Sequence, residues 1–110
     1  MSKLVRDKIP KIVKNSGKES ITHIERDDKV ILELLRDKLI EEANEVKCAN
    51  SSGNIILELV DVYEVMISIS RLYGVSIQNI QQFAKMKREQ RGGFTKMIVL
   101  DDVISKENSQ

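Results

Sequence analysis

The sequence is poor in cysteine and in uninterrupted hydrophobic runs, and each shortage excludes a class of protein. Cys48 is the only cysteine, so no disulfide can form within the chain, and a reducing, cytoplasmic setting is expected. The opening MSKLVRDKIP lacks the apolar run of a signal peptide. The longest apolar stretch, residues 55–73, is interrupted by the charged residues Glu58, Asp61, Glu64 and Arg71. Because charges are costly inside a bilayer, we expect no membrane-spanning helix.

An excess of charge of one sign is also missing. The sequence has 18 basic and 17 acidic residues, a net charge of +1, so the total charge does not attract it to a polyanion. Aromatic residues make up 4% of the sequence and leave few side chains on which bases could stack. We therefore expect no nucleic-acid partner. The length of 110 residues, with 41% hydrophobic and 32% charged residues, is typical of a single globular domain over residues 1–110.

Hydrophobic periodicity predicts a mainly α protein, built as an antiparallel helical bundle. Three long helices are expected at residues 28–49, at residues 55–73, and from residue 77 to the glycines at 92 and 93. Ser76 is a suitable N-cap for the third, and Gly74 is expected just past the end of the second. The segment NSSGN, residues 50–54, has the composition of a loop. Loops this short favour antiparallel packing of consecutive helices.

The flanking segments predict smaller elements. A short helix is expected between Asp7 and Gly17, with Pro10 in its first turn. Ser20–Glu25 and Lys96–Leu100 are rich in β-branched residues and are expected to be short strands. We expect the two to pair with each other, because a lone strand leaves its backbone groups without hydrogen-bond partners.

The first long helix carries a carboxylate on its apolar face. At about 100° per residue, Glu42 lies in the middle of an apolar stripe and Glu45 lies at its edge. The stripe consists of Leu32, Leu35, Leu39, Ala43 and Val46. A charge that faces a core is strongly unfavourable unless something pairs with it. Glu42 is therefore expected to have a partner.

The second long helix repeats this pattern, with Glu58 at the centre of its stripe and Asp61 one turn further on. If the two helices pack through these faces, the carboxylates of Glu42, Glu45, Glu58 and Asp61 converge. Protonation would relieve one of them, whereas a divalent cation relieves all of them together. Oxygen ligands select Mg²⁺ or Mn²⁺ rather than zinc. A solvated acidic face is the alternative explanation of any single pair.

Basic residues crowd the last turns of the third long helix, just before two glycines: Lys85, Lys87, Arg88 and Arg91. Cations are favourable at a helix C-terminus, which is a sufficient structural reason for them. A second interpretation is that they bind phosphates, with the opening segment KLVRDK adding Arg6. Beside a cluster that binds Mg²⁺, they indicate a substrate with several phosphates.

Taken in order, these motifs resemble a known family. E-E-x-x-E at Glu41, Glu42 and Glu45, then twelve residues, then E-x-x-D at Glu58 and Asp61, is similar to the signature of the MazG-like branch of the all-α nucleoside triphosphate pyrophosphohydrolases. The opening KLVRDKIPKIV and the late RGGF resemble a small single-domain subgroup related to phosphoribosyl-ATP pyrophosphohydrolases. The resemblance covers nearly the whole chain.

The resemblance implies Mg²⁺-dependent hydrolysis of a nucleoside triphosphate to the monophosphate and pyrophosphate, with removal of non-standard nucleotides as the expected role. The metal ligands it implies are Glu42, Glu45, Glu58 and Asp61, with Mn²⁺ as a substitute ion. Glu41 and Glu42 are the implied catalytic residues, Glu41 as a base that positions water. The residues implied to bind substrate phosphates are Arg6, Lys87, Arg88 and Arg91. A homodimer or homotetramer is also implied.

Two alternatives remain open at this point. One is hydrolysis of phosphoribosyl-ATP, which is the same cut on a bulkier nucleotide. The other is a helical binding or regulatory module without turnover, which predicts that replacing Glu42 with an apolar residue stabilises the protein. Larger members of the family have two such domains or extra helices, neither of which is expected from this sequence, so their base selectivity does not carry over.

Overall fold

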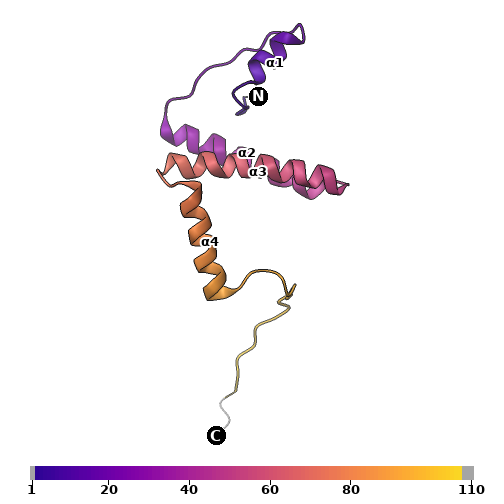
Figure 1. Ribbon diagram of the computed structural model, residues 1–110, viewed down its shortest axis with the longest axis vertical. Helices are drawn as coiled ribbons and strands as arrows, with labels where there is room; N and C mark the ends of the chain where they lie inside the picture. Colours follow the sequence, from indigo (N-terminus) through magenta and orange to yellow (C-terminus); the bar gives the residue numbers. More distant parts are fainter. Residues whose placement is uncertain (1, 108–110) are drawn as a thin grey trace. The chain divides into compact units, whose positions relative to one another are not determined.

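The structure is a computed structural model that describes residues 2–107. Its helices are α1 (Ile9–Asn15), α2 (Asp28–Cys48), α3 (Ser52–Leu72) and α4 (Ile77–Arg91) (Figure 1). The prediction of a mainly α, helical-bundle protein is confirmed. The chain divides into two compact units, Met1–Ile77 and Gln78–Gln110. The expectation of a single domain over residues 1–110 stays a prediction.

In the first unit, α1 begins after Lys8 and has Pro10 in its first turn, where the missing N–H of proline costs no helical hydrogen bond. Beyond its end, Gly17 adopts a φ of +85°, and its N–H donates to the carbonyl of Lys14 at 3.0 Å. A positive φ is strained for residues with a Cβ, which explains why a glycine closes this helix. The predicted short helix is confirmed.

Side-chain caps fix the starts of α2 and α3. The carboxylate of Asp27 accepts a hydrogen bond from the N–H of Lys29 at 2.9 Å. The hydroxyl of Ser51 accepts one from the N–H of Asn54 at 3.2 Å. Each such cap contributes about 1 kcal/mol to helix stability. Because Ser51 is a cap, α3 begins earlier than predicted, and the expected loop over residues 50–54 is wrong for its last three residues.

The helices α2 and α3 pack against each other as an antiparallel hairpin (Figure 1). Leu35 of α2 and Val65 of α3 are buried, and both belong to the apolar stripes of their helices. Ser70 is also buried; its hydroxyl donates to the carbonyl oxygen of Val75, which closes the end of α3 around Gly74 at a φ of +69°. The predicted position of Gly74 just past this helix is confirmed.

Much of α3 is not covered by α2. Ile56, Leu59, Val60 and Tyr63 follow the i, i+3, i+4, i+7 spacing of one helix face, and between 44% and 59% of each is exposed. Even so, none of the helices within residues 2–107 combines the length and the apolar character needed to cross a membrane.

The predicted strands are wrong. No strand occurs within residues 2–107, and both Ser20–Glu25 and Lys96–Leu100 lack regular structure. Ile21, Ile98 and Val99 are almost fully exposed. Their β-branched side chains favour an extended backbone, but a strand also needs a hydrogen-bonded neighbour, and neither segment has one in the described part of the chain.

All of α4 except its first residue belongs to the second unit, and the helix starts directly after Ser76 and ends at Arg91, as predicted. Gly92 follows with a φ of +80°, and its N–H donates to the carbonyl of Arg88 at 2.8 Å. This is the helix-ending role expected of the first of the two glycines.

Candidate metal centre

Three carboxylates of the hairpin converge, as the apolar stripes predicted. Glu42 of α2 and Glu58 and Asp61 of α3 each offer one oxygen, and these oxygens lie within 4.8 Å of one another. Two oxygens bound to the same Mg²⁺ are at most about 4.2 Å apart, because each lies about 2.1 Å from the ion. The three carboxylates therefore need only small side-chain movements to share an ion, and their oxygens are the ligands that Mg²⁺ and Mn²⁺ prefer.

The fourth predicted ligand, Glu45, does not join this group. It lies one turn beyond Glu42 on α2, where its side chain is exposed. Its negative charge still acts on the cluster, since it is one of the charges that raise the pKa of Glu58. The structure thus brings three of the four predicted ligands together and leaves Glu45 at the rim.

Lys38 pairs with the carboxylates of α2. Its Nζ is 3.2 Å from Oε2 of Glu41 and 3.4 Å from Oε1 of Glu42. Only 17% of the Lys38 side chain and 12% of the Glu42 side chain are exposed, against 40% for Glu41. Lys3 approaches the other oxygen of Glu41 at 3.8 Å. Motif reasoning missed Lys38, although its i+3 and i+4 spacing to the two glutamates was a usable signal.

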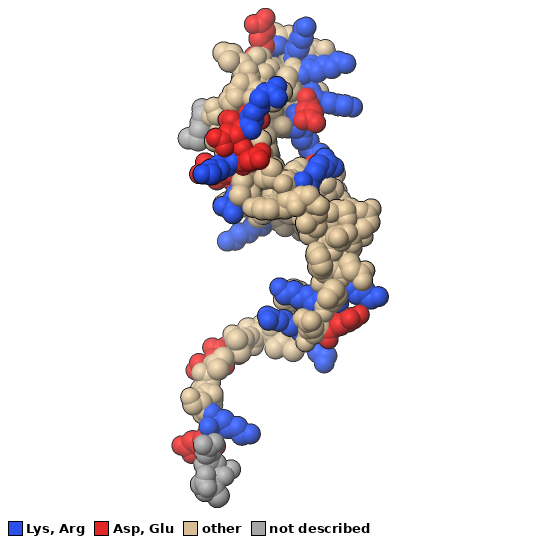
Figure 2. All heavy atoms as spheres, turned by 90° about the vertical axis from the view of Figure 1, so that its left-hand side faces the viewer, with Lys and Arg blue, Asp and Glu red and all other residues tan. Residues whose placement is uncertain are grey.

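Arg6 pairs with carboxylates of α3. Its Nη2 donates to Oδ1 of Asp61 at 2.6 Å, and its Nη1 is 3.8 Å from Oε1 of Glu64. The residue predicted to bind substrate phosphates is therefore paired with carboxylates of α3. Figure 2 shows that acidic and basic side chains lie next to one another on the face of the molecule that it presents. The ion pair also ties the segment before α1 to α3.

Glu58 is the third member of the cluster and, unlike Glu42 and Asp61, has no ion-pair partner among residues 2–107. Partial burial raises the pKa of Glu58 above its ordinary value. Neighbouring negative charges raise it further, those of Glu45, Asp61 and Glu42. The protein's own cations thus pair with Glu42 and Asp61 and leave Glu58 without a counter-charge in the described part of the chain.

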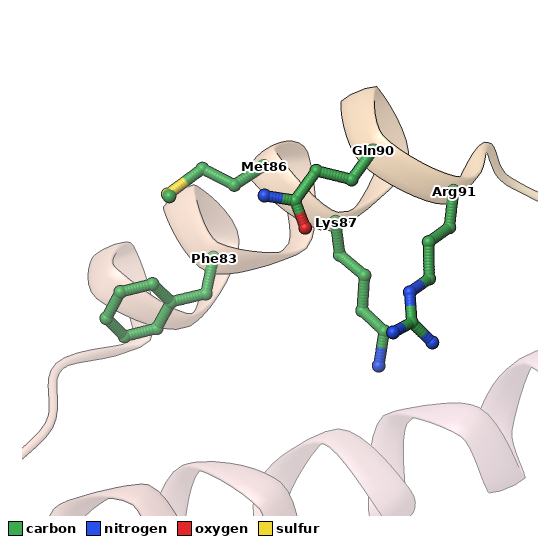
Figure 3. A pocket seen from close by; sticks show the side chains of 5 residues that line it. All are labelled: Phe83, Met86, Lys87, Gln90 and Arg91. Carbon is green, nitrogen blue, oxygen red and sulfur yellow. The ribbon is translucent and has the colours of Figure 1, made fainter.

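The remaining predicted phosphate ligands lie on α4. Lys87 and Arg91 line a shallow hollow together with Phe83, Met86 and Gln90 (Figure 3). The spacing of four residues places both cations on one side of the helix, and in Figure 3 their side chains extend in the same direction. Arg88 is not part of this lining. Phe83 and Gln90 carried no motif by which the sequence could have singled them out.

Comparison of the chain with known protein families, with curated proteins and with solved structures finds no match. Function must therefore be inferred from the chemistry of the residues themselves.

Proposed function

We propose that the protein is a Mg²⁺-dependent nucleoside triphosphate pyrophosphohydrolase of the MazG-like kind that its motifs resemble. The observation that carries the proposal is the approach of Glu42, Glu58 and Asp61, from two helices, to within 4.8 Å of one another. Exposed acidic groups are common without an ion. These three are partly buried, however, and Glu58 among them has no ion-pair partner within residues 2–107. Such an arrangement favours a bound divalent cation.

The proposed reaction divides the work between the cluster and nearby side chains. Bound at these carboxylates, Mg²⁺ would supply charge neutralisation on the phosphates and a more acidic bound water. Glu41, which Lys38 holds beside Glu42, is positioned as the general base that takes a proton from the attacking water. The water oxygen forms a bond to phosphorus, the phosphoanhydride bond breaks, and pyrophosphate leaves with the bonding electrons.

Basic side chains would hold the phosphates of the substrate and stabilise the leaving group. Lys87 and Arg91 already share one side of α4, and Arg88 lies in the same last turns. Arg6 would have to leave Asp61 before it could bind a phosphate.

We propose further that the protein acts in the cytoplasm as a homodimer or homotetramer. An exposed, reduced Cys48 fits a reducing compartment. The exposed stripe of α3 fits a second copy of the chain, since large apolar patches on a protein surface mark interaction sites. A nucleotide is the proposed substrate, and no nucleic acid or membrane partner is proposed.

The test is product analysis after incubation with Mg²⁺ and a panel of ribo- and deoxyribonucleoside triphosphates that also includes phosphoribosyl-ATP. Monophosphate plus pyrophosphate, absent with EDTA and with Glu42→Gln, would support the proposal and rank the substrates. Diphosphate plus orthophosphate would contradict it. Absence of turnover with every nucleotide would favour a binding or regulatory module.

A further inference from the structure

Lys38 is unusually enclosed for a lysine that forms ion pairs. Only 17% of its side chain is exposed, whereas the exposed fractions of Arg6 and Lys3 are 50% and 65%. An exposed ion pair on a helix contributes little, because ordering a long side chain offsets most of the attraction. Lys38 instead places one ammonium within 3.4 Å of two adjacent carboxylates, one of which belongs to the acidic cluster.

We propose that Lys38 is a positioning residue with two effects on the candidate metal centre. Its ammonium holds Glu41 next to Glu42, where Glu41 can act on a water beside the cluster. Its positive charge also weakens the attraction of the cluster for a divalent cation. The first effect rests on the proposed function, whereas the second does not require any turnover.

The first effect follows from the hydrogen-bonding capacity of an ammonium group. Lys38 Nζ donates to Oε2 of Glu41 at 3.2 Å and lies 3.4 Å from Oε1 of Glu42, so it offsets the repulsion between the two carboxylates. Without this charge, Glu41 would keep only Lys3, at 3.8 Å, as a partner. Glu41 is 40% exposed and would then be free to turn toward solvent.

The second effect is Coulombic. A unit positive charge next to Glu42 opposes a divalent cation bound by the same carboxylate. At this short range, in a water-like dielectric and with screening by salt, removing this charge corresponds to about fivefold tighter binding of the cation. A purely structural lysine would produce the opposite result, since loosening the hairpin would scatter the ligands and weaken binding.

The experiment compares Lys38→Met, which keeps the unbranched stem, with Lys38→Arg, which keeps the charge. Lys47→Met is the matched control, because Lys47 is an exposed lysine of the same helix. Free Mn²⁺ is titrated by electron paramagnetic resonance without nucleotide, and kcat and KM are measured separately. Lys38→Met is expected to bind Mn²⁺ about fivefold tighter while kcat falls about 10- to 100-fold at a similar KM. Lys38→Arg should restore most of kcat, and Lys47→Met should change neither quantity.

Whether Lys38 acts through Glu41 is tested by introducing Lys38→Met into a Glu41→Gln variant. If Lys38 acts through Glu41, it should lower kcat no further there; independent, multiplying losses would overturn the positioning role. Weaker Mn²⁺ binding by Lys38→Met would overturn the counter-charge role. Should that variant melt early, Lys38→Gln makes the same change of charge. A wild-type protein that binds Mn²⁺ but hydrolyses no nucleotide would overturn the proposed function and the positioning role that rests on it, while the counter-charge role would stand. A wild-type protein that binds no Mn²⁺ would overturn the counter-charge role as well.

Discussion

Arg6 and Asp61 are 55 residues apart in sequence, yet the guanidinium of one donates to the carboxylate of the other at 2.6 Å. Asp61 is also one of the three residues whose oxygens converge in the candidate metal centre. A divalent cation bound at this candidate centre would therefore compete with Arg6 for the same carboxylate.

This competition predicts opposite effects of Arg6→Gln on stability and on ion binding. The pair is half-exposed, so its loss should lower the free energy of unfolding without metal by no more than about 1 kcal/mol. Mn²⁺ should bind several-fold tighter, because Asp61 loses its built-in counter-ion. Urea denaturation and Mn²⁺ titration measure the two effects. Arg36→Gln, an exposed arginine of α2, is the control. Weaker Mn²⁺ binding by Arg6→Gln would mean that Arg6 supports the site rather than competes for it.

The raised pKa of Glu58 predicts how stability without metal depends on pH. In the folded protein Glu58 keeps its proton to a higher pH than in the unfolded chain, where its pKa is near 4.5. The folded state therefore binds more protons over that interval, and the stability contributed by this group falls as the pH rises through it. Glu58→Gln removes the titration, so the variant should melt higher than the wild type at pH 7 in EDTA. The difference should close as the pH falls below about 4.5.

Adding Mn²⁺ at pH 7 should reverse the order of these two proteins. The wild type gains stability from the bound ion, whereas Glu58→Gln lacks a ligand and gains less. Melting temperatures in EDTA and in Mn²⁺ give both comparisons in one experiment. If Glu58→Gln melted lower than the wild type already in EDTA, Glu58 would have a stabilising partner and would not be an uncompensated charge.

The parts of this arrangement that sequence reasoning found are the local ones. Helix α2 was predictable because its apolar period, its Asp27 cap and its end are all encoded within neighbouring residues. Glu42 and Glu58 were predictable as a pair because each lies on the apolar stripe by which its helix packs. The predicted start of α3 was too late because Gly53 and Asn54 were assigned to a loop. The cap by Ser51 allows both residues in the first turn of the helix.

The parts that sequence reasoning missed depend on tertiary structure. The pairing of Arg6 with Asp61 joins an irregular segment to a helix, and no periodicity reports such a contact. The prediction of a strand at residues 20–25 was wrong for a similar reason, because residue composition does not show whether a neighbouring strand is present to pair with it. Glu45 belongs to the same E-E-x-x-E motif as Glu42, but it lies at the edge of the apolar stripe. Whether a residue at the edge reaches the cluster depends on how far α2 is rotated about its axis, which the motif does not specify.

Replacing one proposed ligand should distinguish a metal centre from an acidic surface that binds no ion. Glu42→Gln keeps the shape of the side chain but halves its oxygens and removes its charge. We expect at least about tenfold weaker Mn²⁺ binding, the lower end of what disturbing a metal site costs, and loss of nucleotide hydrolysis. Glu33→Gln, an exposed glutamate of the same helix, should change neither. Isothermal titration with Mn²⁺ is the measurement, and equal affinities of the two variants would place the ion elsewhere or nowhere.

The exposed stripe of α3 predicts the last outcome, which concerns assembly. Val60 lies in the middle of this stripe, next to Leu59 and one turn from Ile56 and Tyr63. At an ordinary surface position a lysine would change the free energy of unfolding by no more than about 0.5 kcal/mol. At an interface Val60→Lys would bury a charge against a second copy of the chain, so it should convert a dimer or tetramer to monomer and lower the melting temperature.

Light scattering after size-exclusion chromatography measures the mass directly. Ile12→Lys is the matched control, because Ile12 is a β-branched apolar residue of α1, outside this stripe. Its exposed fraction of 58% is close to the 53% of Val60. The control should leave the mass unchanged. A wild-type protein that runs as a monomer, with Val60→Lys as stable as Ile12→Lys, would show that the stripe does not bind a second copy. If the Val60→Lys variant is a monomer and binds Mn²⁺ with the affinity of the wild type, the metal centre is complete within one hairpin. This is what the approach of carboxylates from α2 and α3 of one chain predicts.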